Sequence, residues 1–398
     1  MDALILDAPL KTATVQSIPI PVPASNELLV RVGAIALNPV DALYTFNPLG
    51  ETGRVVGSDF AGIVEALGTD VPSLNPHMRV GQRVAGFLQG ACSTNERSGA
   101  FAEYLTVSHD LVWRVQDSMS LPEAASVSLC ALTAAQILYY RLGLPAPFPF
   151  EGSQDSDTSA SSIEPQHPLT VFIYGASTSV GLNAAQLVHL SSSTSGTPIS
   201  VFGAARPSHN SKLTAAPYSY TALVDYRNPD WPAQTRALTG GKGVDIALDC
   251  ISEGPSVARV ASTLAPKGKM AVVRSREGKA WEAAEGTLPS EPVYGAVWEG
   301  LGERVEYQGF VVPASPRARQ FAVAFYQFLS ESRNESVLCP SPIRCMPGGL
   351  ERVVSDGFTL LGPGTMGQRV TDREEDWMKP VSGEKIIYKL ETGRGSRS

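Results

Sequence analysis

The chain has 398 residues, of which 43% are hydrophobic, so it is long enough to bury a core in each of two domains. Its formal net charge of −7 argues against a nucleic-acid-binding surface, because no basic face offsets the general acidity. The five scattered cysteines favour reduced thiols, and no signal peptide or apolar run of the ~20 residues that span a bilayer is apparent, so we expect a cytoplasmic protein without a membrane segment.

The first third of the chain is rich in short apolar segments separated by turn residues. Strands are expected at residues 27–36, 62–68 and 100–107, and the first of them ends at Asn38-Pro39. This pattern predicts a small barrel-like domain.

From Leu121 the apolar spacing becomes helical. Ser120 is a plausible N-cap for a helix that opens with Leu121 and Pro122, and residues 133–142 are expected to form another helix. Residues 145–168 are rich in Pro, Ser and Asp, a composition that cannot build a core. We therefore expect a flexible, exposed insertion there.

A glycine-containing turn follows the insertion, in a window between Glu164 and Asp225 that holds no carboxylate. The apolar residues 171–174 predict a strand, Gly175 and Gly181 flank a small-residue turn, and a helical segment comes next. Such a layout lets a dinucleotide pyrophosphate approach backbone N–H groups at a helix N-terminus, although an ordinary βα junction has the same outline.

The end of the next expected strand, residues 199–202, indicates which dinucleotide would bind. Folds that prefer NAD place Asp or Glu about 20 residues after the glycines, where the acid holds the ribose 2′-hydroxyl. That place is basic and rich in polar side chains in this chain, which suits a 2′-phosphate and predicts NADPH; the alternative is a solvated loop. The residues concerned are Arg206, Ser208, His209, Asn210 and Lys212.

Strands and helices alternate from residue 170 to residue 273, which predicts a parallel sheet covered by helices and hence an α/β fold. Residues 316–331 predict an amphipathic helix. Residues 385–390 predict a terminal strand, which fits a chain that returns to finish its first domain.

Several segments together resemble the medium-chain dehydrogenases/reductases. They are Gly57–Gly68, Val80–Val84, Gly243–Cys250 and Ser382–Lys385. Four further features resemble the fungal trans-acting enoyl reductases that serve polyketide synthases, with or without peptide-synthetase modules. They are the turn Asn38–Asp41, the insertion, the step Asp225-Tyr226-Arg227 and the strand end Asp249-Cys250-Ile251.

The resemblance implies a Rossmann-type doubly wound parallel sheet domain and a GroES-like β-barrel substrate domain. We expect the GroES-like domain at residues 1–130, completed by 314–398, and the NADPH-binding domain at 131–313, with its insertion at 145–168. Zinc-dependent relatives use a His-Glu pair where this chain has Ser58-Asp59. Their structural zinc needs four thiolates, whereas Cys92 stands alone in that region, so no metal is expected.

Without a metal, hydride would pass from the nicotinamide to the β-carbon of an α,β-unsaturated thioester, and hydrogen bonds would stabilise the enolate oxygen. The sequence does not identify the acid that protonates the α-carbon. Leu43 occupies the position of the family's lysine, and the neighbouring Tyr44 is more simply a packing or surface residue, so we assign no catalytic residue.

The resemblance also implies contact residues, which for the cofactor come from separate segments of the chain. They are Pro39, Val40, Asp41, Ala42, Ser177, Thr178, Ser179, Val180, Arg206, Ser208, Asn210, Lys212, Tyr226, Leu264, Ala265, Ile387 and Tyr388. Two segments, expected from opposite domains, would line the acyl pocket, with core packing as the alternative. They are Ala131, Leu132, Thr133, Ala134, Ala135, Gln136, Ile137 and Leu138, and Gly295, Ala296, Val297, Trp298 and Glu299.

The resemblance thus predicts a monomeric, stand-alone enoyl reductase that uses NADPH to reduce a polyketide intermediate on the acyl carrier domain of a synthase. One alternative is a zinc-free quinone or enone reductase that acts on diffusible substrates. Another is a non-catalytic NADPH-binding partner of a synthase.

Overall fold

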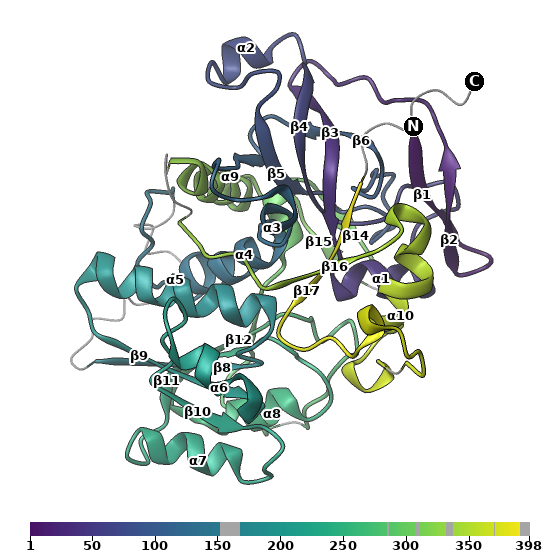
Figure 1. The fold of residues 1–398 in the computed structure, drawn as a ribbon. Coiled ribbons are helices and arrows are strands. Elements are labelled where there is room, and N and C mark those ends of the chain that lie inside the picture. The colour runs from purple at the N-terminus through teal and green to yellow at the C-terminus, as the bar shows by residue number, and fades with distance from the viewer. Residues whose placement is uncertain (152–167, 285, 308–309, 332–336, 370, 391–398) are drawn as a thin grey trace. The chain divides into compact units, whose positions relative to one another are not determined.

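A computed structural model describes residues 1–151, 168–284, 286–307, 310–331, 337–369 and 371–390 (Figure 1). The chain divides into two compact units. The first comprises Met1–Leu129, Leu301–Ser315 and Phe325–Ser398, and the second Cys130–Gly300 and Pro316–Ala324. We predicted domains at residues 1–130 with 314–398 and at 131–313. The two compact units do not show whether those domains fold independently, so these boundaries stay a prediction.

The second unit contains a six-stranded parallel sheet with the order β10-β9-β8-β11-β12-β13. The strands are β8 (Leu169–Tyr174), β9 (Ile199–Ala205), β10 (Ala222–Asp225), β11 (Val244–Asp249), β12 (Leu264–Val272) and β13 (Val293–Tyr294). The chain starts at β8, builds outward to β10 and then returns to the other side of β8. This is the doubly wound arrangement, with its topological switch between β8 and β11, so the predicted parallel sheet is confirmed.

Three helices pack against this sheet, α5 (Ser179–Ser195), α7 (Trp231–Leu238) and α8 (Ser256–Ala261) (Figure 1). The short α6 (Asn210–Thr214) follows β9. The apolar spacing of α7 and α8 turns their large side chains inward, where Trp231 is fully buried and stacks on Phe172 of β8 at a ring-centroid distance of 5.6 Å. The core of the unit therefore lies directly beneath the strand that leads into the glycine turn.

The first unit contains the sheet β16-β17-β3-β4-β5-β7, with β6 also paired to β3. The strands are β3 (Glu27–Ala36), β4 (Asp59–Leu67), β5 (Arg83–Phe87), β6 (Tyr104–Ser108), β7 (Val112–Arg114), β16 (Ile343–Met346) and β17 (Lys385–Lys389). The predicted terminal strand is confirmed as β17, which lies antiparallel to β3.

The remaining strands and α-helices of the described chain lie outside these two sheets. They are the hairpin β1 (Asp2–Asp7) and β2 (Thr12–Ser17), the pair β14 (Val305–Glu306) and β15 (Val311–Val312), and the helices α1 (Pro39–Phe46), α2 (Val71–Leu74), α3 (Leu121–Ala125), α4 (Ser128–Ala135), α9 (Pro316–Glu331) and α10 (Thr359–Leu361). Ser120 caps α3 as predicted, and α9 confirms the amphipathic helix. Within the described ranges, no helix combines the length and apolar character that crossing a membrane requires.

The expected insertion departs from the prediction at its beginning. Residues 152–167 lie outside the described residues, but Phe148 and Phe150 precede them. Phe148 is buried, and its ring centroid lies 5.7 Å from that of Phe321 and 5.9 Å from that of Tyr139. Two apolar aromatic side chains thus anchor the start of a segment that its Pro, Ser and Asp content had predicted to be exposed throughout.

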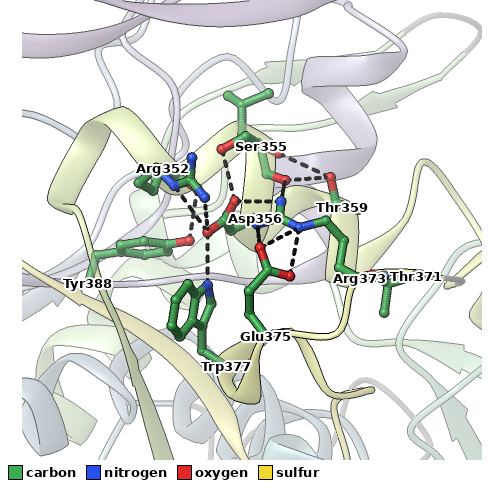
Figure 2. Close-up of polar contacts among 10 residues, drawn as sticks. Arg352, Ser355, Asp356, Thr359, Thr371, Arg373, Glu375, Trp377 and Tyr388 are labelled. Carbon is green, nitrogen blue, oxygen red and sulfur yellow. Dashed lines mark hydrogen bonds and ion pairs between the residues drawn. The ribbon is translucent and has the colours of Figure 1, made fainter.

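A buried carboxylate organises the chain before β17 (Figure 2). Asp356 lies in the π-helix Val353–Phe358 and accepts hydrogen bonds from Trp377 Nε1 (3.1 Å), Arg373 Nη1 (3.1 Å) and Arg352 Nε (3.2 Å). Arg373 also pairs with Glu375. Side chains from residues 373–377 are thereby fixed to the π-helix by one carboxylate, which the sequence analysis did not identify.

Candidate active site

The glycine turn joins β8 to α5. Gly175 has a φ of +81°, a conformation that favours glycine. A Cβ atom on Gly181 would lie 2.4 Å from the carbonyl oxygen of Gly175, so no other residue fits there without moving the backbone. Thr178 caps α5, since its Oγ1 donates to the Gly175 oxygen (2.8 Å) and accepts from the Gly181 N–H (3.1 Å). Both glycines therefore serve close packing of the turn against the helix.

The N-terminus of α5 is suited to a pyrophosphate. The first N–H groups of a helix have no partner within the helix and carry partial positive charge. The first turn includes the predicted contacts Ser179 and Val180, both half-buried, and contains no acidic residue. Because β8 and β11 are neighbours, this turn also lies at the topological switch of the sheet, where such folds bind ligands.

The end of β11 forms the facing side of this switch. Asp249 is buried, and it accepts hydrogen bonds from the N–H groups of Ile251 (2.9 Å) and Ser252 (2.7 Å) and from Ser256 Oγ (2.6 Å). Burial raises the pKa of the Asp249 carboxyl, whereas these hydrogen bonds lower it. The Asp249 carboxylate thus fixes the turn that carries Ile251. This turn lies against the glycine turn, because a Cβ atom on Gly175 would contact the Ile251 side chain.

The second turn gathers cationic side chains after β9. Arg206 Nε donates to the hydroxyl of Tyr226 (2.9 Å), so these two predicted contacts lie together. Partial burial, then the charges of Lys212 and Arg206, lower the pKa of His209. Asp225, the acid at the end of β10, forms a bidentate ion pair with Arg227, which lowers the pKa of the Asp225 carboxyl. The local field at Arg206 and Lys212 is therefore positive.

The two predicted acyl-pocket segments are in contact, but both belong to the second unit, which corrects the expectation of opposite domains. Gln136 Nε2 donates to the Ala296 oxygen (3.1 Å), and Arg141 pairs with Glu299. A Cβ on Gly295 would lie 2.5 Å from Ile137. Residues 131–138 are all buried, on α4 and the π-helix Gln136–Arg141, so their apolar side chains also serve as core.

Leu264 and Ala265 are not brought to the glycine turn. Leu264 is the Cα partner of Val244 at the beginning of β11, whereas the glycine turn follows the ends of the strands, where Asp249 pairs with Val272. From Val244 to Asp249, β11 rises roughly 16 Å, and β12 is irregular between Leu264 and Lys269. The parallel register therefore places these two residues at the opposite edge of the sheet from Gly175.

In the first unit, the Asn-Pro turn is tied to a buried polar group that we call the Asp59 cluster: Asn38, Asp41, Ser58, Asp59 and Lys385. Lys385 Nζ donates to Asp59 Oδ2 (2.6 Å) and to Asn38 Oδ1 (3.0 Å). Asn38 Nδ2 donates to Asp59 Oδ2 (2.9 Å). The N–H of Leu129 donates to the other Asp59 oxygen (2.9 Å), so both oxygens of this carboxylate have partners.

The same cluster holds the first turn of α1, which carries the predicted contacts Pro39, Val40, Asp41 and Ala42. Asp41 accepts from the Asn38 N–H (2.7 Å) and from Ser58 Oγ (2.6 Å). Burial raises the pKa of the Asp41 carboxyl to about 7, although these two hydrogen bonds lower it. Ser58 and Asp59, which stand where zinc-dependent relatives have metal ligands, are thus engaged in internal hydrogen bonds. Within the described chain, no three His, Cys, Asp or Glu side chains group as metal ligands.

The remaining predicted residues of this unit are buried or packed. Ile387 and Tyr388 lie on β17 and are fully buried, and the Tyr388 hydroxyl donates to the Arg352 oxygen (2.9 Å). The Tyr44 ring lies 6.1 Å from that of Tyr307. Sequence analysis missed the structural roles of Lys385 and Asn38, although both lie in segments that carried the family resemblance.

The predicted fold is confirmed by comparison with known proteins. Residues 24–117 match the family model of the alcohol dehydrogenase GroES-like domain, and residues 179–289 match that of the zinc-binding dehydrogenases. The crystal structure of the CurK enoyl reductase superposes with a TM-score of 0.68 at 18% identity, covering 98% of both chains. That of mycobacterial Rv1454c complexed with NADPH gives a TM-score of 0.65, also at 18% identity, over 98% of this chain and all of that one.

Sequence relatives define the group more narrowly. The trans-enoyl reductase caaB of Aspergillus niger is 30% identical over 374 residues, which are 93% of this chain and 92% of that protein. The trans-enoyl reductase ACTTS2 of Alternaria alternata is 28% identical and covers 95% of both chains. The chain therefore belongs to the trans-enoyl reductase family of the medium-chain dehydrogenases/reductases, and the predicted oxidoreductase class is confirmed.

Proposed function

We propose that this protein is a stand-alone enoyl reductase that uses NADPH to reduce the α,β-double bond of a polyketide intermediate on the acyl carrier domain of a synthase. The observation that carries the cofactor assignment is the second turn, where Arg206, His209 and Lys212 interact electrostatically and residues 206–224 contain no carboxylate. The names of the relatives, trans-enoyl reductases, support the reaction and a partner that supplies the substrate.

The residues of the second unit fit a dinucleotide phosphate. The pyrophosphate would approach the N–H groups of the first turn of α5, which contains no acidic residue. Arg206 and Lys212 would bind the 2′-phosphate, and the hydrogen bond from Arg206 Nε to Tyr226 holds the guanidinium in place. We assign Ser177, Thr178, Ser208 and Asn210 to the same cofactor on the family resemblance alone.

NADPH would supply the hydride that adds to the β-carbon of the enoyl thioester. The chain must then hold the thioester, stabilise the negative charge on its oxygen and admit a proton to the α-carbon. We assign the acyl chain to residues 131–138 and 295–299, which the contacts of Gln136 and Gly295 bring together. In the other unit, we assign Pro39, Val40 and Ala42 to the cofactor on the family resemblance alone, and the Asp59 cluster fixes the turn that carries them.

Cofactor choice tests the proposal first. Arg206→Ala and Lys212→Ala should each raise the NADPH dissociation constant about tenfold or more, because a hydrogen bond to a charged group contributes roughly 1.5–3 kcal/mol. NADH binding should change little, since NADH lacks the 2′-phosphate. Lys267→Ala is the matched control, because Lys267 is an exposed cation of the same unit on β12. Equal affinity of the unmodified protein for NADH and NADPH would contradict the assignment.

Substrate choice separates the rival functions. NADPH oxidation should be fast with a crotonyl thioester of pantetheine and slow with a quinone. The reverse result would identify a quinone or enone reductase. NADPH binding without turnover of any substrate, including enoyl groups loaded on an acyl carrier domain, would identify a non-catalytic partner.

A further inference from the structure

His209 lies between two permanent cations in a long segment of the chain that has no acid. Residues 165–224 contain no Asp or Glu, and Arg206 and Lys212 are their only Arg and Lys. His209 is three residues from each of them. It is half-buried at the end of the 3₁₀-helix Pro207–His209, which continues directly into α6. A side chain that titrates near neutral pH is thus placed within a pair of fixed positive charges.

The backbone brings these three side chains to one face of the turn. The His209 N–H donates to the Arg206 oxygen (2.9 Å), which closes the turn between them. Residues three apart are nearly eclipsed in a 3₁₀-helix and are surface neighbours in an α-helix. His209 is also the N-cap of α6, which contains Lys212, and the Lys212 ammonium lies 5.9 Å from the ring centre of the buried Tyr218. The spacing therefore aligns one imidazole with a cation on either side.

The other charged groups of this region come from the end of β10. Arg206 Nε donates to the Tyr226 hydroxyl (2.9 Å). The Asp225 carboxylate accepts from Arg227 through Nε (3.0 Å) and Nη2 (2.7 Å), so this acid is already engaged in an ion pair. The two charges that act on His209 are those of Lys212 and Arg206, and both are positive. All of these residues belong to the second unit.

We propose that His209 is a proton-linked ligand of the 2′-phosphate of the cofactor, neutral in the free protein at neutral pH and protonated when the phosphate binds. This inference rests on the cofactor assignment of the proposed function. The phosphate dianion, bound by Arg206 and Lys212, would change the net charge beside the imidazole from positive to negative or neutral. The protonated ring could then donate a charge-assisted hydrogen bond to a phosphate oxygen. One proton passes from solvent to a ring nitrogen, and no other bond is made or broken.

The sign of the resulting pH dependence follows from linkage. In the free protein, partial burial and then the two cations lower the pKa of His209, whereas a bound dianion raises the pKa of the same group. The contribution of the proton to binding is therefore complete below the pKa of the free protein and is lost as the pH rises through the pKa of the complex. NADH and NAD⁺ have no 2′-phosphate, so their binding should lack this dependence. The preference for the phosphorylated cofactor should thus decrease as the pH rises.

Calorimetric titration with NADP⁺ tests the inference, because NADP⁺ carries the 2′-phosphate, and NAD⁺ is the matched ligand without it. At about pH 7.5, in Hepes and in Tris, whose ionisation enthalpies differ, NADP⁺ should take up more protons than NAD⁺, by at most one per chain. The 2′-phosphate contributes little to this difference, since its second pKa is about 6 and it is already a dianion. The NADP⁺ dissociation constant should rise about two- to tenfold from pH 7 to pH 8.

Two variants of His209 identify the group that takes up the proton. His209→Asn keeps a polar side chain that cannot be protonated, so the extra proton uptake should disappear while NAD⁺ binding is unchanged. His209→Lys introduces a permanent cation, so it should bind NADP⁺ at pH 8 at least as tightly as the unmodified protein, also without extra uptake. His189→Asn is the control. His189 is half-buried on α5 of the same unit, and its Nε2 lies 2.9 Å from the Tyr218 oxygen. Its loss should lower the melting temperature and leave the proton uptake as it was.

The outcomes separate this inference from the function on which it rests. Equal proton uptake with NADP⁺ and NAD⁺, or undiminished uptake in His209→Asn, would overturn the role of His209. If NADP⁺ still bound more tightly than NAD⁺, the proposed function would stand. Equal affinity of the unmodified protein for the two cofactors would overturn the cofactor assignment and the inference together.

Discussion

Asp59 and Asp356 are both fully buried carboxylates of the first unit, but they are neutralised in different ways. Asp59 pairs with one ammonium, that of Lys385, whose side chain is itself only 3% exposed. Asp356 pairs with two guanidinium groups whose side chains are 42% and 28% exposed, those of Arg352 and Arg373 (Figure 2). At Asp59 both the carboxylate and the ammonium are buried, whereas at Asp356 only the carboxylate is buried.

The difference lies in what remains when one partner is lost. A half-exposed guanidinium keeps part of its hydration, so its ion pair is screened and contributes little by itself. A buried ammonium and carboxylate depend on each other, because either of them alone would be a desolvated and uncompensated charge. The Asp59 cluster should therefore be sensitive to any single change, whereas the Asp356 group should tolerate the loss of one arginine.

The largest effect is expected for Lys385→Met. It leaves the Asp59 carboxylate buried without its cation, and breaking a buried pair in this way costs about 3–5 kcal/mol of unfolding free energy. Denaturant unfolding measures the loss. Adding Asp59→Asn to the same protein should recover a large part of it, because the stranded charge is then removed. A double variant as unstable as the single one would show that the geometry of the cluster matters more than its charge.

A smaller effect is expected for Asp356→Asn, about 1–3 kcal/mol. The asparagine can still accept from Trp377 Nε1, and the two arginines can turn toward water. Asp376→Asn is the control, because the Asp376 side chain is 93% exposed and pairs with the exposed Lys379, so its loss should cost less than about 0.5 kcal/mol. An Asp356→Asn protein as unstable as Lys385→Met would remove the distinction between the two carboxylates.

The last effect concerns pH and Asp41, and its size depends on the pH interval. The Asp59 cluster contains two carboxylates and one ammonium, and burial raises the pKa of Asp41 to about 7, with Asp59 adding to the rise and Lys385 opposing it. The folded protein then binds a proton that the unfolded chain releases near pH 4. Stability from this group is therefore complete below about pH 4 and is lost as the pH rises through 7, by at most about 1.4 kcal/mol per pH unit. Asp41→Asn should remove this slope, measured as the difference in unfolding free energy between pH 5 and pH 8. Equal slopes in both proteins would show that Asp41 is ionised throughout.

Some parts of the fold and of the candidate site could be predicted from the sequence. The glycine turn was predictable, because strand, turn and helix are contiguous and Gly175 and Gly181 have local steric reasons to be glycine. The basic second turn was predictable for the same reason, since Arg206 and Lys212 are six residues apart. The return of β17 followed from its apolar pattern and from the family resemblance.

The polar clusters were not predictable, because their members are far apart in the sequence. Asn38, Asp59 and Lys385 meet only through the pairing of β3 with β4 and β17, and a single sequence does not state which strands pair. The position of Leu264 was not predictable for a related reason, since only the register of β12 shows at which edge of the sheet it lies; its contact with the cofactor stays a prediction.

The pairing of β17 with β3 also has a consequence for biosynthesis. The ammonium of Lys385 follows the carboxylate of Asp59 by 326 residues. At about 5–20 residues per second, roughly 20–60 seconds of translation separate the two. During that time Asp59 and Asn38 cannot be buried at low cost, and the stretch Ala34–Ala36 of β3, which pairs with β17, lacks that partner. We expect this part of the nascent first unit to stay open, and exposed to chaperones, until β17 has left the ribosome.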